Sequence, residues 1–186
     1  SKRSRESRDR LVIRRRYNCT KTRLNWREIM SEHLVTTQRI AELEEVRVEH
    51  QFNSNAIRFT KNLGSITGLK RLGIHQVRLA PGRDSTTHHY HEADEEFLYI
   101  ISGNGIAKIG AEEFEVHAGD FMGFPSPSLP HSMHNNSNED LVYLMGGEKW
   151  PVDVVRYPEQ QKTMIKSNGN RSWTQDSQLS ELPPRN

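Results

Sequence analysis

Short apolar stretches alternate with turn residues between residues 69 and 147 of the chain. Each stretch ends near glycine, proline, asparagine or aspartate, the residues that tight turns favour. The stretches are Leu72–Leu79, Phe97–Ile101, Ile106–Ile109, Glu113–Val116, Phe121–Phe124 and Leu141–Met145. Many short strands at this spacing predict an antiparallel sandwich or barrel. The pattern occurs once, so we expect a single barrel.

The segments on either side of this region have different patterns. Residues 24–46 carry loosely recurring apolar residues and favour helix, with Thr36 or Thr37 suited to capping a short second helix. From Trp150 onward the chain is rich in proline, so we expect it to strap over the barrel and fray after about residue 170. We therefore expect a basic tail with a short helical arm (1–45), a β-barrel with flanking strands (46–160) and a partly disordered C-terminal tail (161–186).

Composition narrows the class of protein without changing this picture. The chain has 186 residues, 33% of them hydrophobic, and a mean hydropathy of −0.82, which still allows one compact core. No apolar run is long enough to cross a bilayer, so we expect no membrane partner. Cys19 is the single cysteine, which excludes an internal disulfide and fits a reducing compartment. We expect a cytoplasmic protein.

Charge is concentrated at the N-terminus. The net charge is +2, yet residues 1–30 contain eleven Lys or Arg and three acidic residues, so the remainder is acidic. This composition suits a solvated tail, an arm for nucleic acid or an anionic membrane, or an organelle-targeting leader. Glu6 and Asp9 weaken the leader interpretation. The helical stretch lacks a second helix after a glycine turn, which disfavours a nucleic-acid partner.

Two histidine clusters carry the candidate chemistry. Residues two apart on a strand share a face, so His89 and His91 project together while His88 and Tyr90 point the other way. A short turn then reverses the chain, and Glu96 opens the next strand beside the two histidines. His131 opens a later strand and supplies a third imidazole.

Three imidazoles and one carboxylate suit a single first-row divalent metal ion. We therefore predict that His89, His91, Glu96 and His131 bind one ion, which the ligand types leave open as Zn, Mn, Fe or Ni. His88 is a competing ligand that breaks the alternation. We expect His75 to be a packed residue, His134 to lie off the site, and Asn135 either to orient a ligand or to end its strand.

These residues resemble two motifs of the cupin superfamily. The first motif runs Gly, a short gap, His-x-His, three or four residues, Glu, six residues, Gly. The matching positions are Gly82, His89, His91, Glu96 and Gly103. The second runs Gly, five residues, Pro-x-Gly, two residues, His, three residues, Asn. The matching positions are Gly119, Pro125, His131 and Asn135.

The chain departs from the second motif where Pro127 replaces the usual glycine and one further residue follows. Shorter stretches, among them Asn55–Thr60 (NAIRFT), are similar to a group of uncharacterised single-domain cupins. The resemblance implies an all-β fold, a small antiparallel double-stranded β-helix or jelly-roll barrel, with an N-terminal helical arm and a C-terminal extension. It also implies a metal-binding site and a homodimer.

The sequence leaves the function open between two classes. In the first, the chain is a metal-dependent enzyme of dioxygenase, decarboxylase, isomerase or lyase type, acting on a small polar or anionic molecule. In the second, the barrel binds or senses a small ligand such as a sugar or an acid without catalysis. No catalytic residue separate from the ligands is visible, so the sequence assigns no reaction.

Overall fold

The predicted strands all form, and alternating burial along them places one face of each strand in the core. The computed structural model describes residues 33–180. A six-stranded antiparallel sheet has the order β1–β2–β3–β10–β5–β8. Its strands are β1 (Val46–His50), β2 (Asn53–Asn62), β3 (Leu72–Leu79), β10 (Leu141–Glu148), β5 (Glu96–Ser102) and β8 (Phe121–Phe124).

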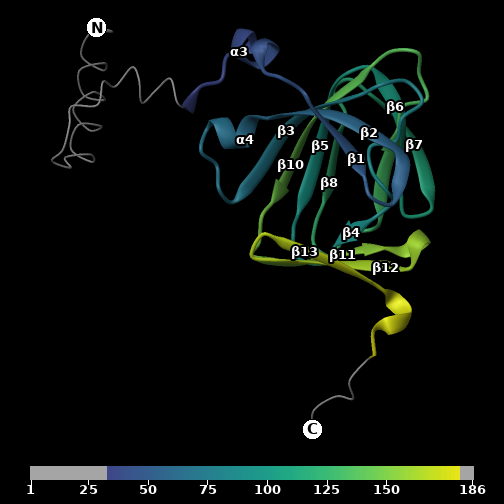
Figure 1. Cartoon of the computed structure of the whole chain (residues 1–186). Helices are drawn as coiled ribbons and strands as arrows, with labels where there is room; N and C mark the ends of the chain where they lie inside the picture. Colours follow the sequence, from purple (N-terminus) through teal and green to yellow (C-terminus); the bar gives the residue numbers. More distant parts are fainter. Residues whose placement is uncertain (1–32, 181–186) are drawn as a thin grey trace, which may run out of the picture. The chain divides into compact units, whose positions relative to one another are not determined.

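The remaining strands form two smaller sheets that meet at two histidines. One sheet has the order β7–β6–β9 and the other β13–β12–β11–β4. A bridge between His89, just before β4, and His131, the first residue of β9, connects them. Figure 1 shows β11, β12 and β13 lying across one end of β3, β10, β5 and β8. The strands are β4 (Tyr90–His91), β6 (Asn104–Ile109), β7 (Glu112–His117), β9 (His131–His134), β11 (Val152–Tyr157), β12 (Lys162–Ser167) and β13 (Asn170–Gln175).

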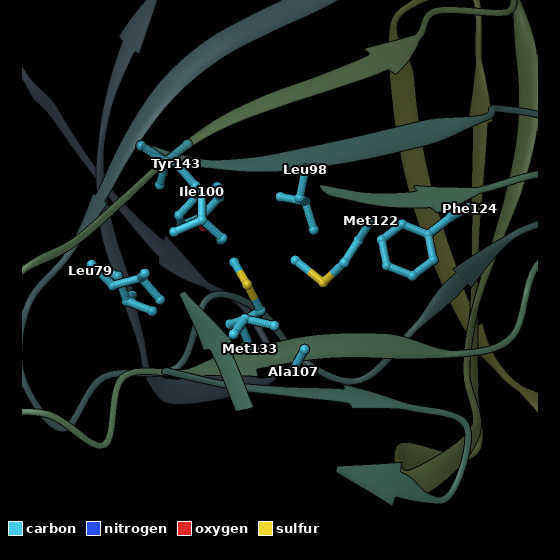
Figure 2. Packing of buried hydrophobic residues seen from close by; sticks show 11 residues of the cluster. Leu79, Leu98, Ile100, Ala107, Met122, Phe124, Met133 and Tyr143 are labelled. Atoms are coloured by element: carbon cyan, nitrogen blue, oxygen red, sulfur yellow. The ribbon is translucent and has the colours of Figure 1, made fainter. Parts of the chain in front are cut away.

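The hydrophobic core lies between the six-stranded sheet and the β7–β6–β9 sheet. Ile100 and Tyr143 from the first sheet are 0% and 1% exposed, and Ala107 and Met133 from the second are 1% and 3% exposed. Figure 2 shows these side chains pointing toward one another across the barrel. Burial of this apolar surface is the main stabilising contribution to the barrel. The all-β antiparallel prediction is confirmed.

Two short helices accompany the sheets, α3 (Thr37–Glu42) and α4 (Leu63–Ile66). The Thr36 hydroxyl accepts a hydrogen bond from the Arg39 backbone N–H at 3.2 Å, so the predicted threonine cap is present. The first part of the predicted helical stretch, residues 24–32, lies outside the described residues, and β1 has begun by Val46. Within residues 33–180, no helix is long and apolar enough to cross a membrane.

The C-terminal segment differs from the sequence prediction. The chain does not fray at residue 170: β12 and β13 form a hairpin that extends the sheet from β11, between the 3-10 turns η1 (Pro158–Gln160) and η2 (Asp176–Gln178). A long-range contact stabilises this hairpin. The Lys162 ammonium lies 4.3 Å from the Phe52 ring centre and 4.7 Å from the Trp173 ring centre. Proline content alone could not reveal a partner that lies in the turn between β1 and β2.

Candidate metal centre

Strand pairing brings the two histidine clusters together. The His89 backbone N–H donates to the His131 carbonyl at 3.2 Å, and the His131 N–H donates to the His89 carbonyl at 2.8 Å. Two residues later, His91 pairs with Val155 of β11. The predicted alternation therefore places His89 and His91 on one face, with His131 directly beside His89.

Glu96 lies at the centre of the three imidazoles. Its Oε2 lies 4.0 Å from His89 Nε2, 3.6 Å from His91 Nε2 and 3.2 Å from His131 Nε2. Further along β5, Leu98 and Ile100 share the Glu96 face and are buried, as the alternation predicts. A side-chain carbon on Gly147, which pairs with Glu96, would lie 3.2 Å from Glu96 Cγ, so the glycine leaves room for the carboxylate.

Each imidazole is held from its far side. His89 Nδ1 lies 2.9 Å from the Thr87 carbonyl, His91 Nδ1 lies 2.6 Å from Asp153 Oδ2, and His131 Nδ1 lies 3.3 Å from the Leu129 carbonyl. Carbonyl and carboxylate oxygens only accept, so these contacts favour a proton on each Nδ1. A ring that carries its only proton on Nδ1 directs its Nε2 lone pair toward Glu96. Metal-binding histidines are commonly oriented in this way.

Ring stacking further restricts two of the histidines. The His131 ring lies parallel to the Phe124 ring, with centres 3.6 Å apart and planes at 8°. The His89 ring stacks on Tyr157 at 5.8 Å. Since packed rings cannot readily rotate, the nitrogen positions are fixed before any ligand binds.

Burial and charge set the protonation of the cluster. Burial lowers the pKa of His89 to about 3, so this ring is neutral at pH 7. Burial acts to raise the pKa of Glu96, but the His131 hydrogen bond and the neighbouring imidazoles outweigh it and lower that pKa to about 2. An ionised carboxylate thus faces three imidazole Nε2 atoms. The Nδ1 atom of each of these rings already contacts an acceptor.

A positive charge at the centre of the cluster would relieve the repulsion between the carboxylate and any Nε2 lone pair that faces it at these distances. A proton shared with Glu96 or a bound cation would supply it. His89, His91 and Glu96 each offer one ligand atom within 4.8 Å of the others, and His131 reaches the same carboxylate oxygen. Nitrogen and oxygen donors of this kind fit a first-row divalent ion.

Comparison with known proteins identifies the fold family. Residues 75–147 match the cupin domain family. The crystal structure of a protein from Acidithiobacillus ferrooxidans, provisionally named a sugar phosphate isomerase, superposes with a TM-score of 0.81 at 34% identity, covering 83% of this chain and 99% of that chain. The chain belongs to the cupin superfamily.

Two further relatives show how much of this cupin is similar to known proteins. A sugar phosphate isomerase from Silicibacter pomeroyi shares the fold, with a TM-score of 0.66 at 22% identity over 75% of this chain and 90% of that chain. An oxalate-binding protein from Thermotoga maritima is 33% identical over 69 residues, 37% of this chain and 55% of that protein. The chain spans about half the length of the curated relatives it matches.

A buried carboxylate that the sequence analysis missed supports the cupin site. Asp153 on β11 is 1% exposed, accepts from His91 Nδ1, and lies 3.3 Å from the Lys166 ammonium, which also pairs with Asp94. These contacts hold its pKa well below the usual range although burial opposes them. Its sequence signal is weak: Asp153 alternates with Val155 and Tyr157 on the buried face of a short strand.

The four residues open into a cavity of about 580 Å³ inside the cupin barrel. Its walls include Tyr143 and Tyr157, whose pKa values burial raises to about 12, so both phenols stay protonated. Arg58 and His75 line the same cavity. This volume lies within the range of pockets that hold small molecules.

The other candidate residues lie away from the cluster. His88 is 7% exposed, with its ring nitrogens 3.2 Å from Ser132 Oγ and 3.0 Å from the Gly110 carbonyl. His134 pairs with Asp84 at 2.8 Å. Asn135 donates to the Leu79 and Glu139 carbonyls. Asn135 therefore shapes the turn after β9 and orients no ligand.

Proposed function

We propose that this cupin binds one divalent metal ion through His89, His91, Glu96 and His131 and acts on a small polar or anionic molecule. One observation carries the proposal: three imidazoles, each held at Nδ1 by an acceptor, direct Nε2 toward a single carboxylate oxygen. A bound ion would act as a Lewis acid on a substrate oxygen. The donor set is compatible with Zn, Mn, Fe or Ni.

We favour an enzyme that isomerises a phosphorylated sugar-like substrate. The supporting relative, provisionally named a sugar phosphate isomerase, is 34% identical and is covered over 99% of its length. Aldose–ketose isomerisation moves one proton between neighbouring carbons and another between their oxygens, so it needs a base that removes a proton from one carbon and delivers a proton to the next. Glu96, which is ionised and lines the cavity, is the candidate proton acceptor.

The second candidate function is ligand binding without catalysis. It is favoured by the oxalate-binding relative from Thermotoga maritima, at 33% identity over 69 residues. The two candidates differ in one property. An isomerase converts a sugar phosphate and loses that activity when a chelator removes the metal, whereas a binding module retains its ligand unchanged.

Elemental analysis of the full chain, purified without chelator or histidine tag, tests the metal site. We expect close to one ion per chain in the wild type and a large loss in His89→Ala. His134→Gln is the matched control, because His134 pairs with Asp84 outside the cluster and should leave the metal content unchanged. Less than about 0.1 ion per chain, together with no effect of His89→Ala, would refute the metal proposal.

We also propose a homodimer. On the outer face of the six-stranded sheet, Tyr99 and Phe121 pair across β5 and β8 and are 42% and 66% exposed, with Ile101 beside them at 43%. Exposed apolar residues that cluster in this way favour a protein interface. Sedimentation of the wild type and of Phe121→Glu tests this assignment, and a monomeric wild type would refute it.

A further inference from the structure

Arg58 points into the barrel where its neighbours on β2 are apolar or small. Ala56 and Thr60, two residues to either side, are 1% and 8% exposed, so the strand alternation places Arg58 on the interior face. Arg58 also lines the cavity that contains the four proposed metal ligands. A guanidinium remains charged at any physiological pH, so this position puts a fixed positive charge inside the barrel.

The hydrogen bonds of Arg58 are incomplete. Nη1 donates to the Ser85 carbonyl at 2.8 Å, while Nε is buried and has no partner among residues 33–180. Within that range no carboxylate lies within 4.0 Å of the guanidinium. By contrast, Arg78 pairs with Glu45 at 2.6 Å and Arg156 with Glu92 at 2.7 Å. Burying a cation without a counter-charge lowers the stability of the fold. An unpaired guanidinium at this position therefore favours the binding of a negatively charged ligand.

A second polar group that lines this cavity is also incomplete. His75 projects from β3 into the same cavity, and its Nδ1 is buried without a partner in the described part of the chain. Burial, and then the charges of Lys149 and Arg58, lower the pKa of His75, so the ring is neutral. Gly73, two residues earlier, lies under Lys149: a side-chain carbon there would come 3.0 Å from Lys149 Cε and 3.8 Å from His75 Nε2.

We propose that Arg58, His75 and the overlying Lys149 form an anion subsite that binds the phosphate or carboxylate group of the substrate. This inference rests on the proposed function, since it assigns the charged group of the same substrate to residues other than the four metal ligands. Tyr143 lines the same cavity as Arg58 and Glu96. A guanidinium binds such oxyanions through paired N–H groups, which a lysine cannot reproduce.

Titration calorimetry with inorganic phosphate tests the subsite on the full chain, both metal-loaded and chelator-treated. We expect Arg58→Gln to weaken phosphate binding about 10- to 100-fold, as for loss of a hydrogen bond to a charged group, and Arg58→Lys to weaken it less. Arg47→Gln is the matched control, because Arg47 lies on the neighbouring strand, is exposed and pairs with Glu49. Wild-type phosphate affinity in Arg58→Gln, or a wild type that binds neither phosphate nor acetate, would overturn the proposal.

Two further measurements separate this inference from the metal proposal. Arg58→Gln should keep its metal content, and His89→Ala should still bind phosphate within about twofold of the chelator-treated wild type. If phosphate binding is lost with the metal, phosphate binds at the ion and the subsite is refuted. Acetate in place of phosphate shows which oxyanion the subsite prefers, and failure of both to bind refutes it.

If Arg58→Gln does not fold, the wild type itself provides the test. The Nε–H resonance of Arg58, assigned by its absence in Arg58→Lys, should shift when phosphate is added, because this N–H has no partner among the residues that the structure describes. An unchanged resonance at saturating phosphate would contradict the proposed contact.

Discussion

The two ends of the cavity differ in how far their polar groups are satisfied by the protein. At the proposed metal end, each imidazole has an acceptor at Nδ1 and all three face one carboxylate. At the Arg58 end, a guanidinium Nε and an imidazole Nδ1 are buried without partners in residues 33–180. The first group is ordered by outer contacts around a carboxylate, and the second holds a guanidinium without a paired carboxylate in the described part of the chain.

This difference implies a division of roles. Outer contacts fix the positions of the side chains where chemistry on a substrate oxygen would occur. Folding therefore orders these side chains before any ligand binds. Unmatched groups at the other end lower stability but strengthen binding of an anion that completes them. This comparison is therefore tested by substitutions that remove a charge or an outer contact of the proposed metal ligands, or an unmatched polar group near Arg58.

Glu96→Gln should have the largest effect on metal binding. The variant keeps the shape of the side chain but removes the negative charge that all three Nε2 atoms face. Removing one partner of a buried charged cluster costs about 3–5 kcal/mol, so we expect metal affinity to fall by at least about 100-fold. Competition with a chromophoric chelator measures the affinity.

Glu95→Gln is the matched control, because Glu95 is exposed and adjacent in sequence. Its metal affinity should equal that of the wild type. Equal losses in Glu95→Gln and Glu96→Gln would show that general charge, and not the cluster, attracts the ion.

The four proposed ligands could be placed from the sequence because local rules fix them. Strand alternation sets His89 and His91 on one face, and the short turn before β5 brings Glu96 beside them. His131 also depends on a long-range pairing, the bridge to His89, so local rules alone did not fix its position beside the other three. Their role as ligands stays a prediction, but the structure brings all four side chains together.

The features that the sequence did not indicate are those that depend on contacts between segments far apart in the chain. Asp153 reaches His91 across 62 positions of the chain, and its alternation with Val155 was the only signal. Arg58 stood out only within a stretch similar to other cupins, although Ala56 and Thr60 mark its face as interior. The β12–β13 hairpin depends on Phe52, so tail composition could not predict it.

Asp153→Asn should have the next largest effect. The amide cannot provide the charged acceptor that orients His91 at 2.6 Å. Loss of such an outer contact typically weakens metal binding about 10- to 100-fold. Asp84→Asn is the control, because it removes the carboxylate of another Asp–His pair, with His134 at 2.8 Å, outside the site. A wild-type metal affinity in Asp153→Asn would contradict the orienting role.

The same pair should make stability of the metal-free protein depend on pH. The pKa of Asp153 lies below 3.8, so its stabilising contribution is present above about pH 4 and is lost as the pH falls. The pKa of His91 is raised above 6.5: burial opposes the shift, but the Asp153 hydrogen bond outweighs it. The His91 contribution is therefore present below about pH 6.5 and is lost as the pH rises through the raised value.

Chelator-treated wild type should thus exceed Asp153→Asn in free energy of unfolding most between about pH 4 and 6.5, by about 1–2 kcal/mol. Urea unfolding at pH 3, 5.5 and 8 measures the difference. Glu113→Gln, an exposed substitution, should show no such maximum. A difference between wild type and Asp153→Asn that is constant with pH would exclude the charged pair.

His75→Leu should have the smallest effect, and its sign should be opposite. Leucine has a similar volume and removes the buried Nδ1 that lacks a partner in the described residues. Leaving such a group unsatisfied costs about 1–3 kcal/mol, part of which packing changes offset, so we expect stability to rise by about 1 kcal/mol. His117→Leu, which removes a histidine that is 63% exposed, is the control and should change stability by less than about 0.5 kcal/mol.

The value of His75→Leu lies in three measurements on one variant. Urea unfolding should show the gain in stability, elemental analysis should show unchanged metal content, and phosphate affinity should fall. This combination arises only if the His75 end of the cavity retains an unsatisfied group for a ligand while the Glu96 end is independently organised. A loss of stability with unchanged phosphate affinity would instead make His75 a packing residue, as the sequence alone suggested, and would leave Arg58 without its proposed neighbour.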